Sequence, residues 1–258
     1  MSEPAPSTRP ATGSGPPLPA PGHTVDSPAP GLWVHQPSRG YRYAMDPLLL
    51  VGFVVEGTPL GAERRFVELG TGGGVAALLL ARQGWVGEGI DVQQAPLDLA
   101  QRSADDSGLS AQLRFTCADG RAWSAGRAGR APVALCNPPY WPARSGPLPA
   151  DPVVAASRFA LHGDLDALIP ALAAMGERVA LVLPLGRVGE AARVLAAAGR
   201  PVARRLDLLP RLALVEGRAA GAPSSPREEA PLRVDGDHSP RVRALYAAAG
   251  ASLPLGAA

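Results

Sequence analysis

The stretch Val67-Glu68-Leu69-Gly70-Thr71-Gly72-Gly73-Gly74-Val75 joins a short apolar strand to a helix through a glycine-rich turn. Glycines after a strand let the backbone turn sharply and approach a ligand without a Cβ in the way. The helix that follows, over 75–81, would add free N–H groups and the positive end of its dipole. The sequence therefore predicts a ligand site at the carboxyl end of the strand 66–69.

Strands and helices alternate on both sides of this turn. Asp46-Pro47, interpreted as an N-cap and a first helical residue, precede the apolar run 48–55. Further on, the pattern predicts strands at 66–69, 87–90, 113–116, 132–136 and 178–183, with helices at 75–81, 95–107, 165–175 and 188–198. Alternation of this kind indicates a parallel sheet that is covered by helices on both faces.

The last two predicted strands break the alternation. They span about 202–208 and 212–216, and only Leu209-Pro210-Arg211 separates them. A parallel crossover needs a dozen or more residues, so strands this close must be antiparallel. The sequence therefore predicts an α/β fold with a mostly parallel, seven-stranded sheet that ends in an antiparallel β-hairpin. This is the Rossmann-like architecture of class I methyltransferases.

The first thirty residues differ from the rest in composition. They contain nine prolines with Ala, Ser and Gly between them, which predicts a disordered tail over 1–30 before a single domain over 31–258. Neither a signal peptide nor a run of about 20 apolar residues is present, so we expect a cytoplasmic monomer with no membrane partner. Cys117 and Cys136 lack metal-ligand spacing, so no metal is expected. The formal net charge of +2 does not by itself demand a nucleic-acid partner.

Gly70, Gly72 and Gly74 decide which ligand the glycine turn fits. The dinucleotide fingerprint Gly-x-Gly-x-x-Gly needs a third small residue, and counting from Gly70 places Val75 there. The turn instead fits Gly-x-Gly-x-Gly with Glu68 before it, which resembles the first motif of class I methyltransferases. The resemblance implies S-adenosylmethionine as the cofactor, with Glu68 near the ammonium group of its methionine part.

Two aspartates follow the next two strands. Asp91 comes after the strand 87–90, about 20 residues beyond the glycines, where a carboxylate can accept hydrogen bonds from both ribose hydroxyls. The alternative for Asp91 is the N-cap of the next helix. The resemblance places Asp119 at the adenine amine of the cofactor, whereas its position before Gly120 also suits an ordinary turn.

The motif Asn137-Pro138-Pro139-Tyr140 follows the strand 132–136. An exocyclic amine on a base is a poor nucleophile because its lone pair is delocalised into the ring. The Asn137 side-chain oxygen and the Pro138 carbonyl can accept the two amine hydrogens, in a turn that the prolines stiffen, and so direct the lone pair towards a methyl donor. Tyr140 offers an aromatic face for stacking. The motif is typical of methyltransferases that act on amino groups conjugated to a π-system.

Outside the tail, nearly the whole chain resembles the bacterial tRNA1(Val) adenine-N6 methyltransferase family. The matching segments are 36–43, 46–50, 67–80, 137–141, 160–162, 212–217 and 239–243. This family methylates N6 of the adenine immediately 3′ of the anticodon in a valine tRNA, so the resemblance implies a tRNA substrate. Bases in RNA loops are already splayed out, so presenting one to an active site costs little.

The residues expected to contact this RNA flank the motifs. They are Pro139, Trp141, Arg39, Arg42, Arg144 and Arg158, although a solvated arginine surface would give the same pattern. Tyr41 and Tyr43 are expected to pack over the cofactor, and His162 to be a packing residue at a helix entry.

Three alternatives for the function remain open. Protein methyltransferases that modify a glutamine amide in release factors use the same four-residue motif, but they usually carry a helical N-terminal domain. Other base methyltransferases, which act on guanine N2 of ribosomal RNA or adenine N6 of DNA, share the chemistry. A scaffold that binds S-adenosylmethionine without activity would not need Asn137 and Tyr140.

Overall fold

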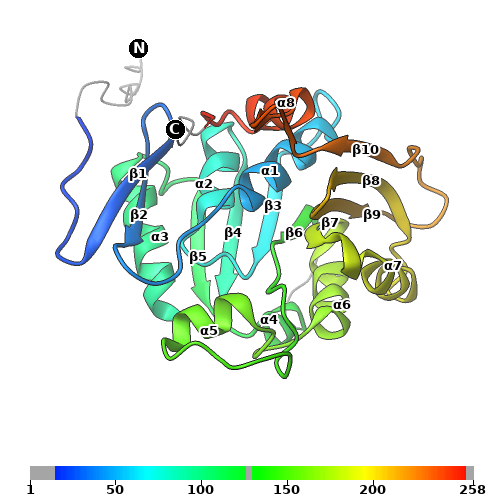
Figure 1. Ribbon diagram of the computed structural model, residues 1–258, viewed down its shortest axis with the longest axis horizontal. Coiled ribbons are helices and arrows are strands. Elements are labelled where there is room, and N and C mark those ends of the chain that lie inside the picture. The colour runs from blue at the N-terminus through cyan, green and yellow to red at the C-terminus, as the bar shows by residue number, and fades with distance from the viewer. Residues whose placement is uncertain (1–14, 126–129, 254–258) are drawn as a thin grey trace, which may run out of the picture.

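The computed structural model of the protein describes residues 15–125 and 130–253. An eight-stranded sheet forms its centre, in the order β10-β8-β9-β7-β6-β3-β4-β5 (Figure 1). The strands are β3 (Arg65–Leu69), β4 (Val86–Asp91), β5 (Leu113–Cys117), β6 (Ala131–Cys136), β7 (Gly176–Pro184), β8 (Val202–Leu209), β9 (Leu212–Gly217) and β10 (Glu228–Pro231).

Strands in the sheet are parallel where a long connection joins them and antiparallel where the connection is short. The pairs among β5, β4, β3, β6 and β7 are all parallel, and β9 runs antiparallel to both β7 and β8. The predicted α/β fold, a mostly parallel sheet with an antiparallel hairpin at one end, is therefore confirmed. The structure adds β10, which pairs in parallel with β8 at the edge. Its sequence Glu-Glu-Ala-Pro has no apolar alternation, so no local pattern predicts this strand.

Helices cover both faces of the sheet. They are α1 (Asp46–Glu56), α2 (Val75–Arg82), α3 (Gln94–Asp106), α4 (Gly120–Ala125), α5 (Pro152–Arg158), α6 (Leu165–Met175), α7 (Val188–Ala197) and α8 (Pro240–Ala248), with a 3-10 turn, η1 (Leu185–Arg187), before α7. Successive residues of a strand point to opposite faces. Thus Phe66 packs with α1, α2 and α8 in one apolar core, whereas Val67 packs with α6 and α7 in the other.

A β-hairpin precedes the first helix and lies beside α3 (Figure 1). Its strands are β1 (His23–Ala29) and β2 (Leu32–Pro37), and a second small hairpin, β11 (Arg233–Val234) with β12 (Asp237–His238), precedes α8. The prediction that residues 1–30 form a disordered tail is therefore wrong for the part from His23 onward, while residues 1–14 lie outside the described residues. Ser103 of α3 and Ser107, which follows the helix as its C-cap, accept hydrogen bonds from the hairpin backbone at 2.9 Å. These contacts stabilise a hairpin whose strands are not predicted from the sequence, because the segment is rich in proline.

The amino end of α1 also differs from the prediction. Met45, not Asp46, occupies the N-cap position, and its side chain makes no capping hydrogen bond. Pro47 lies in the first turn as expected, since its fixed φ suits that position. The Asp46 carboxylate instead accepts a hydrogen bond from the hydroxyl of Tyr140, which is 94 positions further along the chain.

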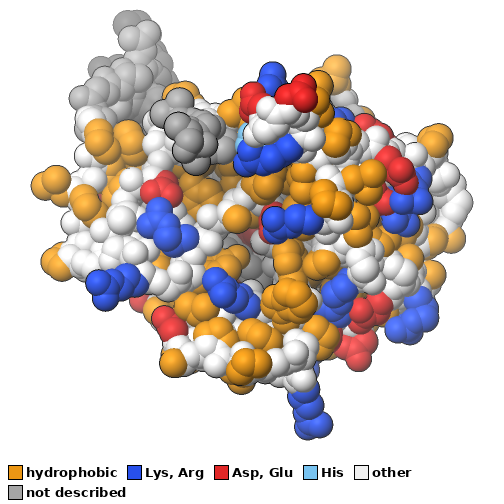
Figure 2. All heavy atoms as spheres, in the orientation of Figure 1, with side chains coloured by type: hydrophobic (Ala, Val, Ile, Leu, Met, Phe, Trp, Pro, Cys, Tyr) orange, Lys and Arg blue, Asp and Glu red, His pale blue; other side chains and the backbone are white. Residues whose placement is uncertain are grey.

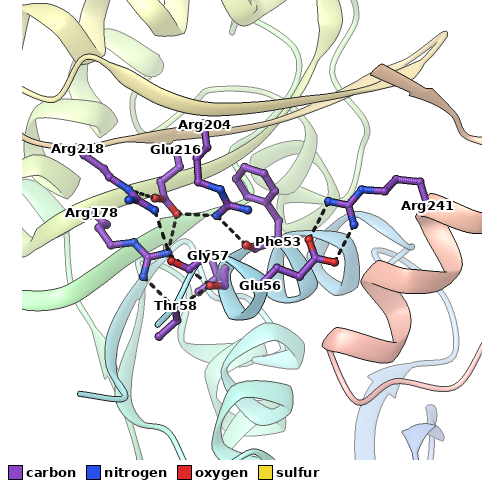
Figure 3. A network of polar contacts seen from close by, with 10 residues as sticks. Phe53, Glu56, Gly57, Thr58, Arg178, Arg204, Glu216, Arg218 and Arg241 are labelled. Atoms are coloured by element: carbon purple, nitrogen blue, oxygen red, sulfur yellow. Dashed lines mark hydrogen bonds and ion pairs between the residues drawn. The ribbon is translucent and has the colours of Figure 1, made fainter. Parts of the chain in front are cut away.

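The carboxyl end of α1 is held by arginines that gather around Glu216 (Figure 3). Glu216 is fully buried and accepts hydrogen bonds from Arg178 at 2.7 Å, from Arg204 at 3.3 Å and from Arg218. The same guanidinium groups donate to the carbonyls of Phe53 and Val54 in the last turn of α1 and of Gly57, its C-cap residue. Cations at a helix carboxyl end interact favourably with its dipole, so this network fixes α1 against β7, β8 and β9.

Candidate active site

A cavity of about 330 Å³ lies where the parallel strands end. Its lining includes Leu69 at the end of β3 and Gly70 after it, Asp91 at the end of β4, Ala118 after β5 and Cys136 at the end of β6. Open α/β sheets hold their ligands at this carboxyl edge. The structure therefore has a cavity at the edge where the glycine-rich turn predicts a ligand site.

The glycine turn takes a shape that other residues would resist. Gly70, Gly72 and Gly74 have φ angles of 70°, 52° and 76°, in the left-handed region that glycine adopts without strain. Gly70 and Gly72 line the cavity, and Gly74 does not. A Cβ at Gly74 would lie 2.8 Å from the Cβ of Ala100, so this glycine lets the turn pack against α3.

Asp91 braces the turn and forms part of the cavity wall. Its carboxylate accepts hydrogen bonds from the backbone N–H of Gly72 at 2.8 Å and of Gln93 at 3.0 Å. Burial raises the pKa of Asp91, and the backbone donors oppose that shift. Gln93 occupies the N-cap of α3, so Asp91 is not the capping residue. A carboxylate has about four lone-pair sites, which leaves room for further donors from a ligand.

Glu68 lies beneath the turn and is almost completely buried. Its Oε2 accepts hydrogen bonds from the Thr71 hydroxyl at 2.7 Å and from the Ala77 N–H at 3.2 Å. Burial raises the pKa of Glu68 to about 8, although both hydrogen bonds lower it. The side chain lines the cavity as a mostly neutral carboxyl at pH 7, so a cation placed against it would favour loss of its proton.

Asp119 lines the cavity, and its side chain is 41% exposed. The Arg121 side chain pairs with its carboxylate and lowers its pKa to about 2. His162 also lines the cavity and is close enough for its charge to lower the pKa values of Asp91 and Asp119. We expected His162 to be a packing residue, whereas the structure places it on the cavity wall with an exposed side chain.

Asn137 and Pro139 reach the cavity from the end of β6. Among the described residues, no hydrogen-bond partner contacts the buried Oδ1 atom of Asn137. A buried oxygen without a partner costs about 1–3 kcal/mol, so a donor from a ligand is its natural complement. Pro138 and Tyr140 are not among the lining residues, and the Tyr140 hydroxyl donates to Asp46 at 2.7 Å.

The residues predicted to contact RNA are dispersed. Arg39 lines the cavity, whereas Arg42 is paired with Asp26 at 2.9 Å. Trp141, Arg144 and Arg158 are exposed and lie outside the cavity lining. Figure 2 shows arginines scattered over one face of the molecule among apolar and uncharged side chains, without a single basic patch.

Part of the cavity wall comes from residues that were not predicted to belong to a site. They are Val34, His35 and Gln36 of β2, Pro96 and Leu99 of α3, and Val153 and Ser157 of α5, together with Tyr41 and Tyr43, which were expected to pack there. No local motif marks these residues, because β2, α3 and α5 are far apart in sequence and meet at the cavity only in the folded chain.

Neither a metal site nor a membrane-spanning helix is found in the described part of the chain. Residues 15–125 and 130–253 contain no group of His, Cys, Asp or Glu side chains that could hold a metal ion. Within the same ranges, no helix has the length and apolar character needed to cross a membrane.

Comparison with known proteins gives a match to part of the sequence and a likeness in fold over most of the chain. No family model matches the chain. A segment of 133 residues is 37% identical to the release factor glutamine methyltransferase of Rhodospirillum rubrum, and this match covers 49% of the chain. The chain spans only 39% of the length of that relative.

Solved structures agree with the fold. A predicted O-methyltransferase from Agrobacterium tumefaciens, protein Atu636, is 18% identical with a TM-score of 0.58, over 80% of this chain and 97% of that one. The hMettl16 catalytic domain, solved in complex with MAT2A 3′UTR hairpin 1, is 16% identical with a TM-score of 0.59, over 78% of each chain. The protein therefore has the Rossmann-like methyltransferase fold.

Proposed function

We propose that this protein is a methyltransferase that uses S-adenosylmethionine and methylates a nitrogen conjugated to a π-system. The observation that carries the proposal is the Oδ1 atom of Asn137, a buried acceptor without a partner, in a residue that lines the cavity at the carboxyl edge of the sheet. An amine or amide N–H of the acceptor molecule would satisfy it.

The residues at the floor of the cavity fit the cofactor. The Gly70 and Gly72 backbone can approach a ligand closely, and Asp91 offers spare lone pairs to two ribose hydroxyls. The buried carboxyl of Glu68 would ionise beside the ammonium group of the methionine part. When bound, S-adenosylmethionine supplies an electrophilic methyl group on a sulfonium. Asp119 would bind the adenine amine only after exchanging part of its pairing with Arg121.

Asn137 and Pro138 would orient the acceptor nitrogen. The Asn137 Oδ1, in a residue that lines the cavity, would accept one of its hydrogens and so direct the lone pair towards the methyl group. Pro138 is not among the lining residues, so its carbonyl would accept the second hydrogen only after acceptor binding brings it to the cavity. The two prolines restrict the turn and so hold Asn137 before the acceptor molecule binds, which is how fixed dipoles lower a barrier. The nitrogen can lose its proton after transfer, so no strong general base is required.

Adenine N6 in a tRNA is the acceptor that we favour. The resemblance of the chain to tRNA adenine-N6 methyltransferases supports it, and so do the two aromatic residues, Tyr41 and Tyr43, that line the cavity. A planar base can pack against aromatic side chains with a gain of about 1–3 kcal/mol. Among the arginines predicted to contact RNA, Arg39 is the one that lines the cavity, where it could contact a phosphate.

A glutamine side-chain amide is the second candidate acceptor. The observation in its favour is the segment that is 37% identical to a release factor glutamine methyltransferase. An amide nitrogen poses the same lone-pair problem as an adenine amine, so Asn137 and Pro138 would perform the same task on either acceptor.

Labelled S-adenosylmethionine and the purified protein test both candidates. Unmodified bulk tRNA and a purified release factor serve as parallel acceptors, with Asn137→Ala as the matched control. Label in N6-methyladenosine supports the tRNA proposal, and label in methylglutamine supports the alternative. Label in a different base would overturn both acceptors and leave N-methyl transfer in place. No transfer by a protein that binds S-adenosylmethionine would contradict the proposal.

A further inference from the structure

The Asp46 carboxylate and the Tyr140 hydroxyl form a hydrogen bond of 2.7 Å between α1 and the loop after β6. The two side chains are 94 residues apart in sequence and are both half-buried. Burial raises the pKa of Asp46, and donation from Tyr140 opposes that shift. Within the described residues, this is the hydrogen bond that the Asp46 side chain makes, and the side chain does not cap its own helix.

Tyr140 is not among the residues that line the cavity. It is half-buried and packs against the apolar core that contains α1, while its neighbours Asn137 and Pro139 line the cavity. The expectation that Tyr140 stacks on the acceptor therefore has no support in this geometry, and the contact with Asp46 gives the residue a different task.

The helix that carries Asp46 is fixed at several points. A Cβ at Gly52 would overlap the backbone of Leu245, which shows how closely α1 packs against α8. At its other end, the arginines around Glu216 donate to the carbonyls of Phe53, Val54 and Gly57 (Figure 3). Asp46 is therefore a rigid point of attachment for any loop that binds to it.

We propose that Asp46 is a positioning residue, which holds Tyr140 and thereby places Asn137 and Pro138 for methyl transfer. The proposal rests on the function proposed above. Only two residues, both prolines, separate Asn137 from Tyr140, so fixing the tyrosine also restricts the asparagine. Loss of the anchor would move the two acceptors out of line, and a displacement of about 1 Å can cost on the order of 100-fold in rate.

Four variants separate this role from general stability. Tyr140→Phe removes the donor and Asp46→Ala removes the acceptor, whereas Asp46→Asn keeps an acceptor oxygen in the same place. Tyr246→Phe deletes the hydroxyl of another buried tyrosine in the same core and is the matched control. Turnover is measured on whichever acceptor the wild type methylates, together with affinity for S-adenosylmethionine and hydrogen exchange in peptides that cover 137–141.

We expect Tyr140→Phe and Asp46→Ala each to lower kcat at least about tenfold, with cofactor affinity within a few fold. The double variant should be no worse than either single one, because both remove the same contact. Exchange in 137–141 should rise in these variants and stay unchanged in Asp46→Asn and Tyr246→Phe.

If Tyr140→Phe had the same kcat and the same hydrogen exchange in 137–141 as the wild type, the positioning role of Asp46 would be refuted. Equal losses of kcat and of cofactor affinity in Asp46→Ala would refute it as well. If the wild type methylates neither tRNA nor a release factor, the proposed function fails. The exchange comparison still tests the anchor in that case, because it needs no acceptor.

Discussion

Glu68→Gln should stabilise the ligand-free protein at neutral pH. Glutamine keeps an oxygen for the Thr71 hydroxyl and the Ala77 N–H and resembles the protonated carboxyl in shape. Burial raises the pKa of Glu68 from 4.5 to about 8 in the folded protein. Between these two pH values the folded state holds a proton that the unfolded state has released. The contribution of Glu68 to the free energy of unfolding therefore falls as pH rises across this window, and Glu68→Gln lacks that contribution.

The size of the effect follows from the two pKa values. Each pH unit in the window costs the wild type about 1.4 kcal/mol. At pH 7 the pH lies 2.5 units above the ordinary value of 4.5, so the penalty approaches about 3 kcal/mol. Near pH 4.5 the penalty is within about 0.5 kcal/mol of zero, and above pH 8 it stops growing.

Urea unfolding at several pH values between about 5 and 8, without ligand, measures this difference. The quantity of interest is the free energy of unfolding of Glu68→Gln minus that of the wild type. It should rise with pH, whereas the same difference for Glu177→Gln, a change at an exposed residue, should stay flat. Parallel pH profiles for the wild type and Glu68→Gln would refute the reasoning, because Glu68 would then have the same pKa in both states.

Three further changes test the site. Asn137→Ala should lower kcat by on the order of 100-fold, with affinity for S-adenosylmethionine within a few fold by calorimetry; equal loss of both would assign Asn137 to cofactor binding. Asp91→Ala should weaken cofactor binding at least about tenfold, because it removes the ribose acceptor and frees the Gly72 N–H; unchanged affinity would contradict this role. Gly74→Ala should destabilise the protein by about 2–4 kcal/mol in urea unfolding, since its φ is 76° and a Cβ would lie 2.8 Å from Ala100. Gly73→Ala, where a Cβ meets nothing within 4 Å, is the control, and equal loss in both would refute the packing argument.

The sequence by itself determined the sheet and the position of the site. Seven of the eight central strands were predicted, because their apolar runs alternate with helices in a chain that has short connections. The glycine turn and the Asn137-Pro138-Pro139-Tyr140 motif each follow a parallel strand. Such strands end at a common edge, so the two motifs had to meet there whatever the packing of the helices.

Tertiary structure alone decided what several of these residues contact. Docking on α3 orders the β1–β2 hairpin and brings β2 to the cavity, although its proline-rich surroundings predict a disordered tail. Arg42, a predicted RNA contact, forms an ion pair with Asp26. Tyr140, a predicted stacking residue, donates a hydrogen bond to Asp46. In each case the partner is distant in sequence, and a periodic pattern carries no information about such partners. Local propensity fixes where strands and turns form, whereas a hydrogen bond depends on which side chains the fold brings within about 3 Å of each other.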